Sequence, residues 1–74
     1  MKTDKIRIAK WYSVTFPNMQ RLDAVCWSWL GGNVFEFTNG GAVMKVGSHD
    51  VRPAKRRHTQ TETDLVVSQA AHTT

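Results

Sequence analysis

Residues 23–32 read DAVCWSWLGG, and the conformation of this stretch decides the fold class of the chain. A helix over residues 19–30 would start after Asn18 as its N-cap and would stop at Gly31. A strand over residues 22–30 would alternate between two faces, one with Leu22, Ala24, Cys26, Ser28 and Leu30 and the other with Asp23, Val25, Trp27 and Trp29. Valine, cysteine and two tryptophans suit a pleated surface better than a helix, where bulky side chains lose rotamer freedom. The strand is therefore the favoured interpretation, and the helix stays open as the alternative.

The segments on either side of this stretch also have strand patterns. Residues 5–16, KIRIAKWYSVTF, alternate with period two, and Pro17 and Asn18 end the run. Residues 33–38, NVFEFT, and residues 42–46, AVMKV, flank Asn39-Gly40-Gly41, which is a strong hairpin signal. Residues 49–53, HDVRP, give a last short strand or an irregular crossing. The sequence thus predicts a mainly β fold, a small antiparallel meander or partly open barrel, with the helix near residues 19–30 as its one variant.

The end of the chain has a different composition from the rest. Residues 58–74 are rich in Thr, Gln and Ser, and their only apolar run is Leu65-Val66-Val67. A segment of such low hydrophobicity gains too little from burial to offset the entropy of ordering. We therefore expect a single small basic β-rich domain over residues 1–57, followed by a disordered C-terminal tail over residues 58–74.

The charge of the chain is unevenly distributed. Residues 1–57 hold all ten Lys and Arg and four of the six acids, which gives a net charge of +6. Residues 58–74 hold the other two acids and no Lys or Arg, which gives −2. A basic body of this kind favours polyanions or acidic protein surfaces as partners.

Catalytic and metal-binding patterns are absent from the sequence. Cys26 stands alone between Val25 and Trp27, as a small buried hydrophobe does. The run Ser48-His49-Asp50 contains the residue types of a catalytic Ser-His-Asp triad, but it does not predict one, because such triads are assembled in space from residues distant in sequence. The histidines lack metal-ligand spacing, and the glycine pairs at 31–32 and 40–41 mark turns without a phosphate-binding pattern. We expect a protein that is not an enzyme and that uses no metal and no cofactor.

The basic residues are the better candidates for a binding surface. Four cations fall within residues 52–57, and more lie along residues 5–11 beside a tryptophan. A solvated surface with no partner is the ordinary explanation for each cation taken singly. The candidate partner-binding residues are Lys5, Arg7, Lys10, Trp11, Arg52, Lys55, Arg56 and Arg57.

The general plan of the chain resembles small phage-encoded regulators that bind bacterial RNA polymerase. The resemblance rests on the size, the charged segment KIRIAKWYSVTF, the meander and the tail after AKRRH, residues 54–58. It implies a non-enzymatic regulator that docks on the host transcription machinery and modulates transcription. Because the resemblance covers only the layout, it carries no residue roles over to this chain.

Two other functions stay open. Basic and aromatic side chains on one face of a small sheet also bind single-stranded nucleic acid, with bases stacked on the rings. A protein inhibitor of another host or defence enzyme would have the same general features. Residues 1–10, MKTDKIRIAK, contain no apolar run typical of a signal peptide, and no segment has the roughly 20 apolar residues that span a bilayer. We therefore expect a cytoplasmic protein with no membrane partner.

Overall fold

The long strand β2 (Arg21–Gly31) organises the sheet. A computed structural model describes residues 1–73, and in it β2 pairs with β1 (Trp11–Thr15) on one side and with β3 (Val34–Thr38) on the other. The strand interpretation of DAVCWSWLGG is confirmed, and the helix alternative over residues 19–30 is wrong. The register of β2 against β3 shifts twice, between Cys26 and Ser28 and between Trp29 and Gly31. Such irregularities bend a strand, and they let β2 curve from one half of the sheet into the other.

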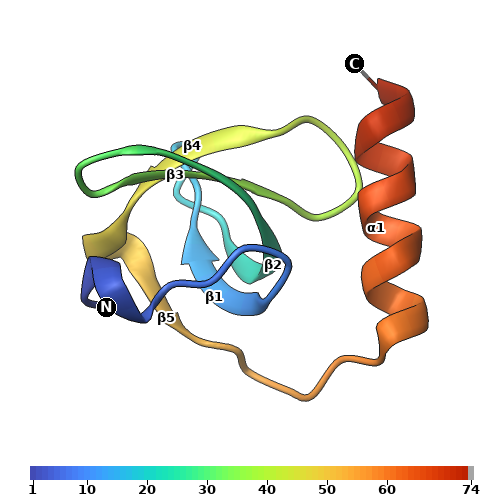
Figure 1. Ribbon diagram of the computed structural model, residues 1–74, viewed down its shortest axis with the longest axis horizontal. Coiled ribbons are helices and arrows are strands. Elements are labelled where there is room, and N and C mark those ends of the chain that lie inside the picture. Colours follow the sequence, from blue (N-terminus) through green and yellow to red (C-terminus); the bar gives the residue numbers. More distant parts are fainter. Residues whose placement is uncertain (74) are drawn as a thin grey trace.

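All the strand pairs are antiparallel, and the sheet order is β4-β3-β2-β1-β5. β4 (Met44–Gly47) returns beside β3, and β5 (Val51–Pro53) pairs with β1. Only a single 3-10 turn, η2 (Ser48–Asp50), separates β4 from β5, so the two edges of the sheet lie near each other. Figure 1 shows β3 and β4 above β1 and β5, with β2 crossing between them. The predicted mainly β fold is confirmed as an open antiparallel sheet: β1 to β4 form the meander, and β5 crosses over to pair with β1.

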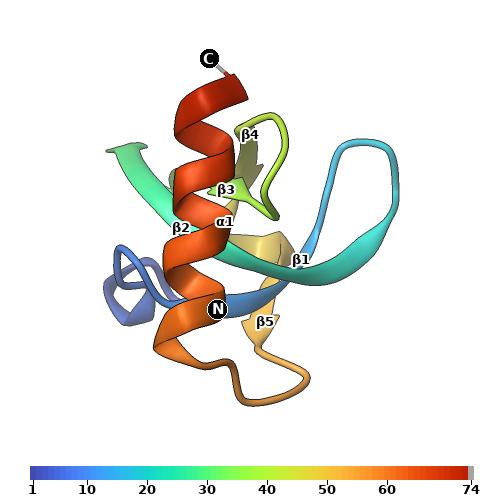
Figure 2. The same cartoon turned by 90° about the vertical axis from the view of Figure 1, so that its right-hand side faces the viewer.

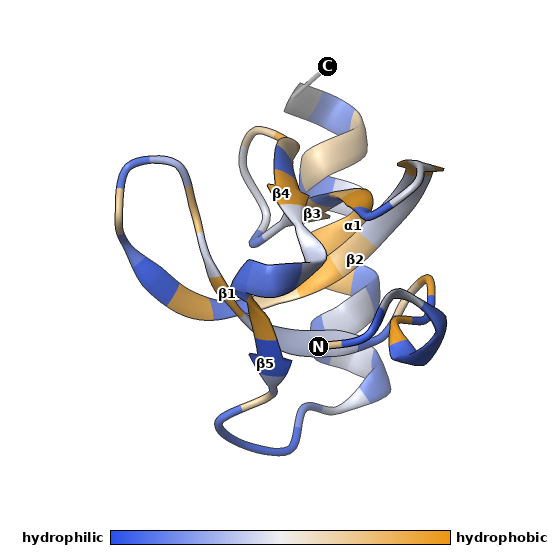
Figure 3. Ribbon diagram, turned by 90° about the vertical axis from the view of Figure 1, so that its left-hand side faces the viewer, coloured by the Kyte–Doolittle hydropathy of each residue, from blue (hydrophilic) through white to orange (hydrophobic). Residues whose placement is uncertain are grey.

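The core lies inside this curved sheet. Its buried residues come from all five strands, from the N-terminal segment and from the residue that follows β1; they are Ile6, Tyr12, Val14, Phe16, Ala24, Cys26, Phe35, Phe37, Val46 and Val51. Alternation along the strands brings every second side chain into this cluster. Figure 3 shows the apolar segments on the strands and a hydrophilic stretch after β5.

The first strand is shorter than the alternation over residues 5–16 predicts. Residues Thr3–Lys5 form a 3-10 turn, η1, and Ala9 has a left-handed backbone with φ of 67°. The backbone N–H of Arg7 donates to the hydroxyl of Tyr12, and that hydroxyl donates to the carbonyl of Lys5. The buried Tyr12 thus holds residues 5–7 as a loop beside the curved sheet, and this loop replaces the expected extension of β1.

The expected disordered tail is wrong for residues 60–73, which form the helix α1 (Gln60–Thr73); Thr74 lies outside the described residues. α1 contacts β2 and β3, and Figure 2 shows it lying across β2. Thr63 and Ala70 are buried, and Val66 and Val67 are half-buried. These four positions follow the i, i+3, i+4, i+7 spacing of one helical face. Only Val66 and Val67 on this face are strongly apolar, so the face is less evident in the sequence than one built of large hydrophobic residues. No helix among residues 1–73 is long and apolar enough to cross a bilayer.

Candidate functional site

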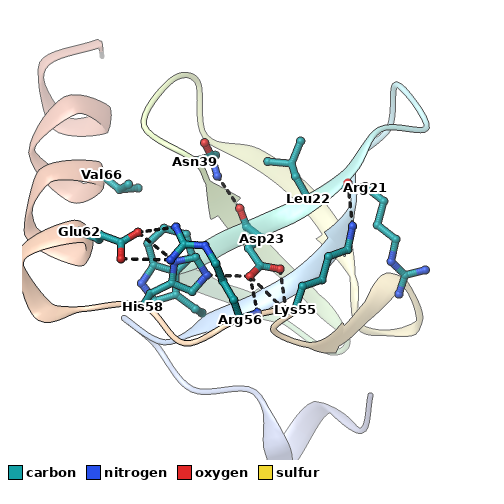
Figure 4. Close-up of a pocket in the computed structure, with 10 residues that line it drawn as sticks. Arg21, Leu22, Asp23, Asn39, Lys55, Arg56, His58, Glu62 and Val66 are labelled. Atoms are coloured by element: carbon teal, nitrogen blue, oxygen red, sulfur yellow. Dashed lines mark hydrogen bonds and ion pairs between the residues drawn. The ribbon is translucent and has the colours of Figure 1, made fainter.

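The loop that joins β5 to α1 is held against the outer side of the sheet by Asp23 of β2. Its carboxylate accepts the backbone N–H of Lys55 at 3.0 and 3.1 Å and that of Arg56 at 3.3 Å. Nε2 of His58 lies 2.7 Å from the same carboxylate. Figure 4 shows these contacts converging on Asp23 from one side. A single acid therefore fixes three positions of a segment that lies more than 30 residues away in sequence.

His58 is enclosed by aromatic and acidic neighbours. Its ring stacks on Trp11, with the ring centroids 3.7 Å apart and the planes inclined by 6°. Nδ1 lies 3.2 Å from a carboxylate oxygen of Glu62, and only 3% of the His58 side chain is exposed. The imidazole thus joins β1, β2 and α1 at one point.

The start of α1 continues this network. Thr59 and Glu62 form a capping box: the hydroxyl of Thr59 accepts the N–H of Glu62, and the Glu62 carboxylate accepts the N–H of Thr59. Glu62 also forms an ion pair with Arg56 at 2.7 Å. The indole N–H of Trp11 donates to the hydroxyl of Thr63 at 2.8 Å. We call Trp11, Asp23, His58, Glu62 and Thr63 the His58 cluster.

Both acids of the His58 cluster are stabilised in their charged form. Partial burial by itself would raise the pKa of Asp23, but the hydrogen bonds from His58 and from the backbone of Lys55 and Arg56 outweigh it and lower the pKa. The hydrogen bond from Arg56, helped by those from Thr59 and His58, lowers the pKa of Glu62 to about 2. The cluster therefore depends on two ionised carboxylates.

The chemistry of the His58 cluster is that of a structural joint. Both ring nitrogens of His58 already have carboxylate partners, so neither is free to contact a bound molecule. An open groove of about 610 Å³ runs beside the His58 cluster, but the carboxylates of Asp23 and Glu62 point at the loop and at the start of α1. Among residues 1–73, no group of three or more His, Cys, Asp or Glu side chains could hold a metal ion. Cys26 is buried, and burial raises the pKa of its thiol to about 11, which keeps it protonated.

The structure places the sequence-predicted site residues in two separate segments. Lys5, Arg7 and Lys10 lie on the loop before β1, whereas the other basic candidates lie on β5 and in the loop after it; these are Arg52, Lys55, Arg56 and Arg57. The two segments lead into and out of neighbouring strands, because β1 pairs with β5. Each of these basic side chains is exposed. Trp11 differs from them, because it is half-buried and has one ring face against His58.

The positive charge of the body is open to solvent. All ten Lys and Arg are exposed. Within residues 1–73, the one ion pair between a Lys or Arg and a carboxylate is Arg56–Glu62. The half-buried Asp23, in contrast, is engaged by backbone N–H groups and by His58. The acids therefore do little to screen the cations, and the surface presents a positive field to a partner.

Sequence reasoning missed an apolar surface next to the first basic segment. Period-two alternation along residues 5–16 puts Ile8 on the same strand face as Ile6. In the structure Ile6 is buried, but Ile8 is 53% exposed at the tip of the loop, close to Trp29, which is 58% exposed. The left-handed Ala9, which ends the alternation, has no recognisable signal in the sequence.

Comparisons of the chain with protein-family models, with curated proteins and with solved structures give no match.

Proposed function

We propose that this protein is a small non-enzymatic regulator that acts in the cytoplasm by docking on an acidic surface of a larger protein. The expected target is a component of the transcription machinery, bacterial RNA polymerase. The single observation that carries the proposal is the set of ten exposed cations, of which only Arg56 has an acidic partner among residues 1–73. Unpaired surface charges of one sign speed the encounter with an oppositely charged partner and suppress wrong partners. The choice of polymerase comes from the resemblance in chain layout, and the charge supports only an acidic target.

Two features favour a protein target over nucleic acid. One face of the Trp11 ring is covered by His58, so this tryptophan is a poor platform for a base. The exposed apolar side chains beside the first basic segment include the aliphatic Ile8 next to Trp29. An exposed patch of mixed aliphatic and aromatic side chains is typical of a protein contact.

The test is a pull-down from a bacterial lysate with the tagged full chain, followed by titration of purified RNA polymerase. The double variant Arg52→Glu/Arg57→Glu should bind about tenfold more weakly or worse, since each change replaces attraction with repulsion. The matched control is Lys45→Glu, a charge reversal on β4 opposite Glu36 of β3 and outside both basic segments, which should bind as the unmodified chain does. Failure of the unmodified chain to retain polymerase subunits would remove the proposed target.

Direct nucleic-acid binding is the second candidate, and the same exposed cations favour it. It predicts that the affinity for a single-stranded oligonucleotide falls by about 0.7 log units per log unit of salt for each phosphate contacted. A flat titration at low salt would exclude this candidate. Capture of a different host or defence enzyme in the pull-down would instead favour the third candidate, an inhibitor of that enzyme, which an activity assay of the captured enzyme would then test.

A further inference from the structure

An apolar surface centred on Ile8 lies apart from the His58 cluster. Ile8 stands between two hollows and lines both of them. The first hollow, of about 330 Å³, lies against Trp29 and Phe35, and the second, of about 260 Å³, lies against Trp27 and Val67. We call Ile8, Trp27, Trp29, Phe35 and Val67 the Ile8 surface.

The backbone holds the Ile8 surface in place. Arg7 donates its N–H to the hydroxyl of the buried Tyr12 at 2.7 Å, and Ala9 donates its N–H to the carbonyl of Cys26 at 2.8 Å. Ile8 therefore lies between two anchored residues and points outward. The indole N–H of Trp29 donates to the carbonyl of Gly32 at 3.0 Å, which fixes that ring at the end of β2. Apolar groups that are already ordered lose little entropy when a partner covers them.

The rim of the Ile8 surface is positively charged. Residues 1–10 hold Lys2, Lys5, Arg7 and Lys10 against the single acid Asp4, a net charge of +3. All four cations are exposed, and none forms an ion pair with a carboxylate in the described chain. Arg7 lines the first hollow together with Asp4, and Lys5 and Lys10 are the chain neighbours of residues that line the two hollows. The surface thus combines two apolar hollows with a neighbouring segment of net positive charge, whose cations form no ion pair with a carboxylate in the described chain.

We infer that the Ile8 surface binds an acidic protein segment that carries large apolar side chains. The apolar side chains of the segment enter the hollows on either side of Ile8, and its carboxylates face Lys5, Arg7 and Lys10. The inference rests on the proposed function, because it names the chemistry of the segment through which an acidic target is recognised. The charge complementarity distinguishes this occupant from a second copy of the chain, which would bring the same cations into contact.

The test is a titration of the ¹⁵N-labelled full chain with three short synthetic peptides of equal length. One alternates Leu with Glu, one alternates Leu with Lys, and one alternates Ser with Glu. Only the Leu–Glu peptide should shift the backbone signals of residues 6–9 and 27–30. Ile8→Asp should weaken its binding about tenfold or more, because the change adds a repelling charge and removes the ridge between the hollows.

The matched control is Met19→Asp, since Met19 is an exposed apolar residue in the turn between β1 and β2, outside both hollows. It should leave the peptide affinity unchanged, and the spectra of both variants report directly whether the fold is intact. Equal binding of the Leu–Lys peptide, equal losses in the two variants, or shifts elsewhere would overturn the inference. The same shifts on concentrating the chain alone, or stronger shifts with a single-stranded oligonucleotide, would also overturn it, in favour of self-association or nucleic acid.

The two proposals fail separately. If RNA polymerase is not retained but the Leu–Glu peptide binds at residues 6–9, the proposed target is wrong and the Ile8 surface stands. If polymerase binds the Ile8→Asp variant as tightly as the unmodified chain, and the peptide does not bind, the inference fails while the proposed function stands.

Discussion

Asp23 and His58 show how two side chains can position a whole helix. The two residues lie 35 positions apart, and their hydrogen bond brings the loop after β5 across the outside of β1. The imidazole fills the space between the indole of Trp11 and the first turn of α1, where Glu62 approaches it from the other side. No local pattern connects these residues, so the sequence contains no signal for their contact.

Replacement of His58 should destabilise the fold. His58→Ala removes the stack on Trp11 and leaves Asp23 without its side-chain partner, so we expect a loss of about 1–3 kcal/mol in the free energy of unfolding. Urea unfolding followed by circular dichroism measures the loss. The control is His49→Ala, which removes a side chain that is 75% exposed and should change stability by less than about 0.5 kcal/mol. Equal effects of the two substitutions would show that the His58 cluster contributes nothing to stability.

At the scale of elements, the strands follow from sequence and the helix does not. Period-two alternation and the turn residues at Pro17 and at Asn39-Gly40 locate β2, β3 and β4 within a few positions. Their side chains alternate between the core and the outside, which is the property that the pattern measures. The bends of β2 and the left-handed Ala9 come from tertiary contacts, so the lengths of the strands and the exposure of Ile8 could not be predicted.

The helix left two weak signals in the sequence. Thr59 and Glu62 have the spacing of a capping box, and residues 63, 66, 67 and 70 have helical spacing. Thr63 and Ala70, which are the most buried residues of this face, are not strongly hydrophobic, so the low average hydrophobicity of residues 58–74 gave no indication that the face is buried. The basic candidates are exposed, as their composition implies, but their division into two segments depends on the fold.

The docking of α1 should weaken in acid. The folded pKa of Glu62, at about 2, and that of Asp23 lie below the ordinary values for these acids. Their contribution to stability is therefore complete above those ordinary values and is lost as the pH falls from about 5 towards 2. Across this pH range, the melting temperature of Glu62→Gln should fall less steeply than that of the unmodified chain, because the glutamine keeps the cap but carries no charge. Asp64→Asn is the same acid-to-amide change at an exposed position of the same helix, and its melting temperature should fall with pH as steeply as that of the unmodified chain.

The buried face of α1 can be tested at one position. Ala70 is 0% exposed, and Ala70→Glu would force a carboxylate between the helix and the sheet. We expect a loss of about 2–3 kcal/mol, which lowers the melting temperature by roughly 10–20 °C in a domain of this size. Ser68→Glu places the same side chain on an exposed position of the same helix and should leave the melting temperature nearly unchanged. A tail that did not dock would respond equally to both substitutions.

Considered as a whole, the molecule buries both faces of the middle of β2. Ala24 and Cys26 face the interior of the curved sheet, while Val25, on the opposite face, is covered where α1 crosses. Both faces of DAVCWSWLGG are therefore covered at the middle of the strand. Beyond the crossing, β2 extends past the helix, and its last residues remain open beside the loop that carries Ile8. The C-terminal end of β2 is thus the part of this strand whose side chains a partner can contact.

The thiol of Cys26 offers a way to measure both the opening of the fold and the binding of a partner. It is 1% exposed and lines the second hollow of the Ile8 surface, and its raised pKa keeps it unreactive in the folded chain. Modification by a disulfide reagent near neutral pH should therefore wait for a local opening, so its rate reports the population of opened molecules. We expect Ala70→Glu to accelerate the reaction and a saturating acidic peptide to slow it, with Ser68→Glu as the control. A rate as fast in buffer as in concentrated urea would contradict this expectation. With one cysteine in the chain, a single absorbance trace can follow both the loosening of the fold and the occupancy of its surface without any added label.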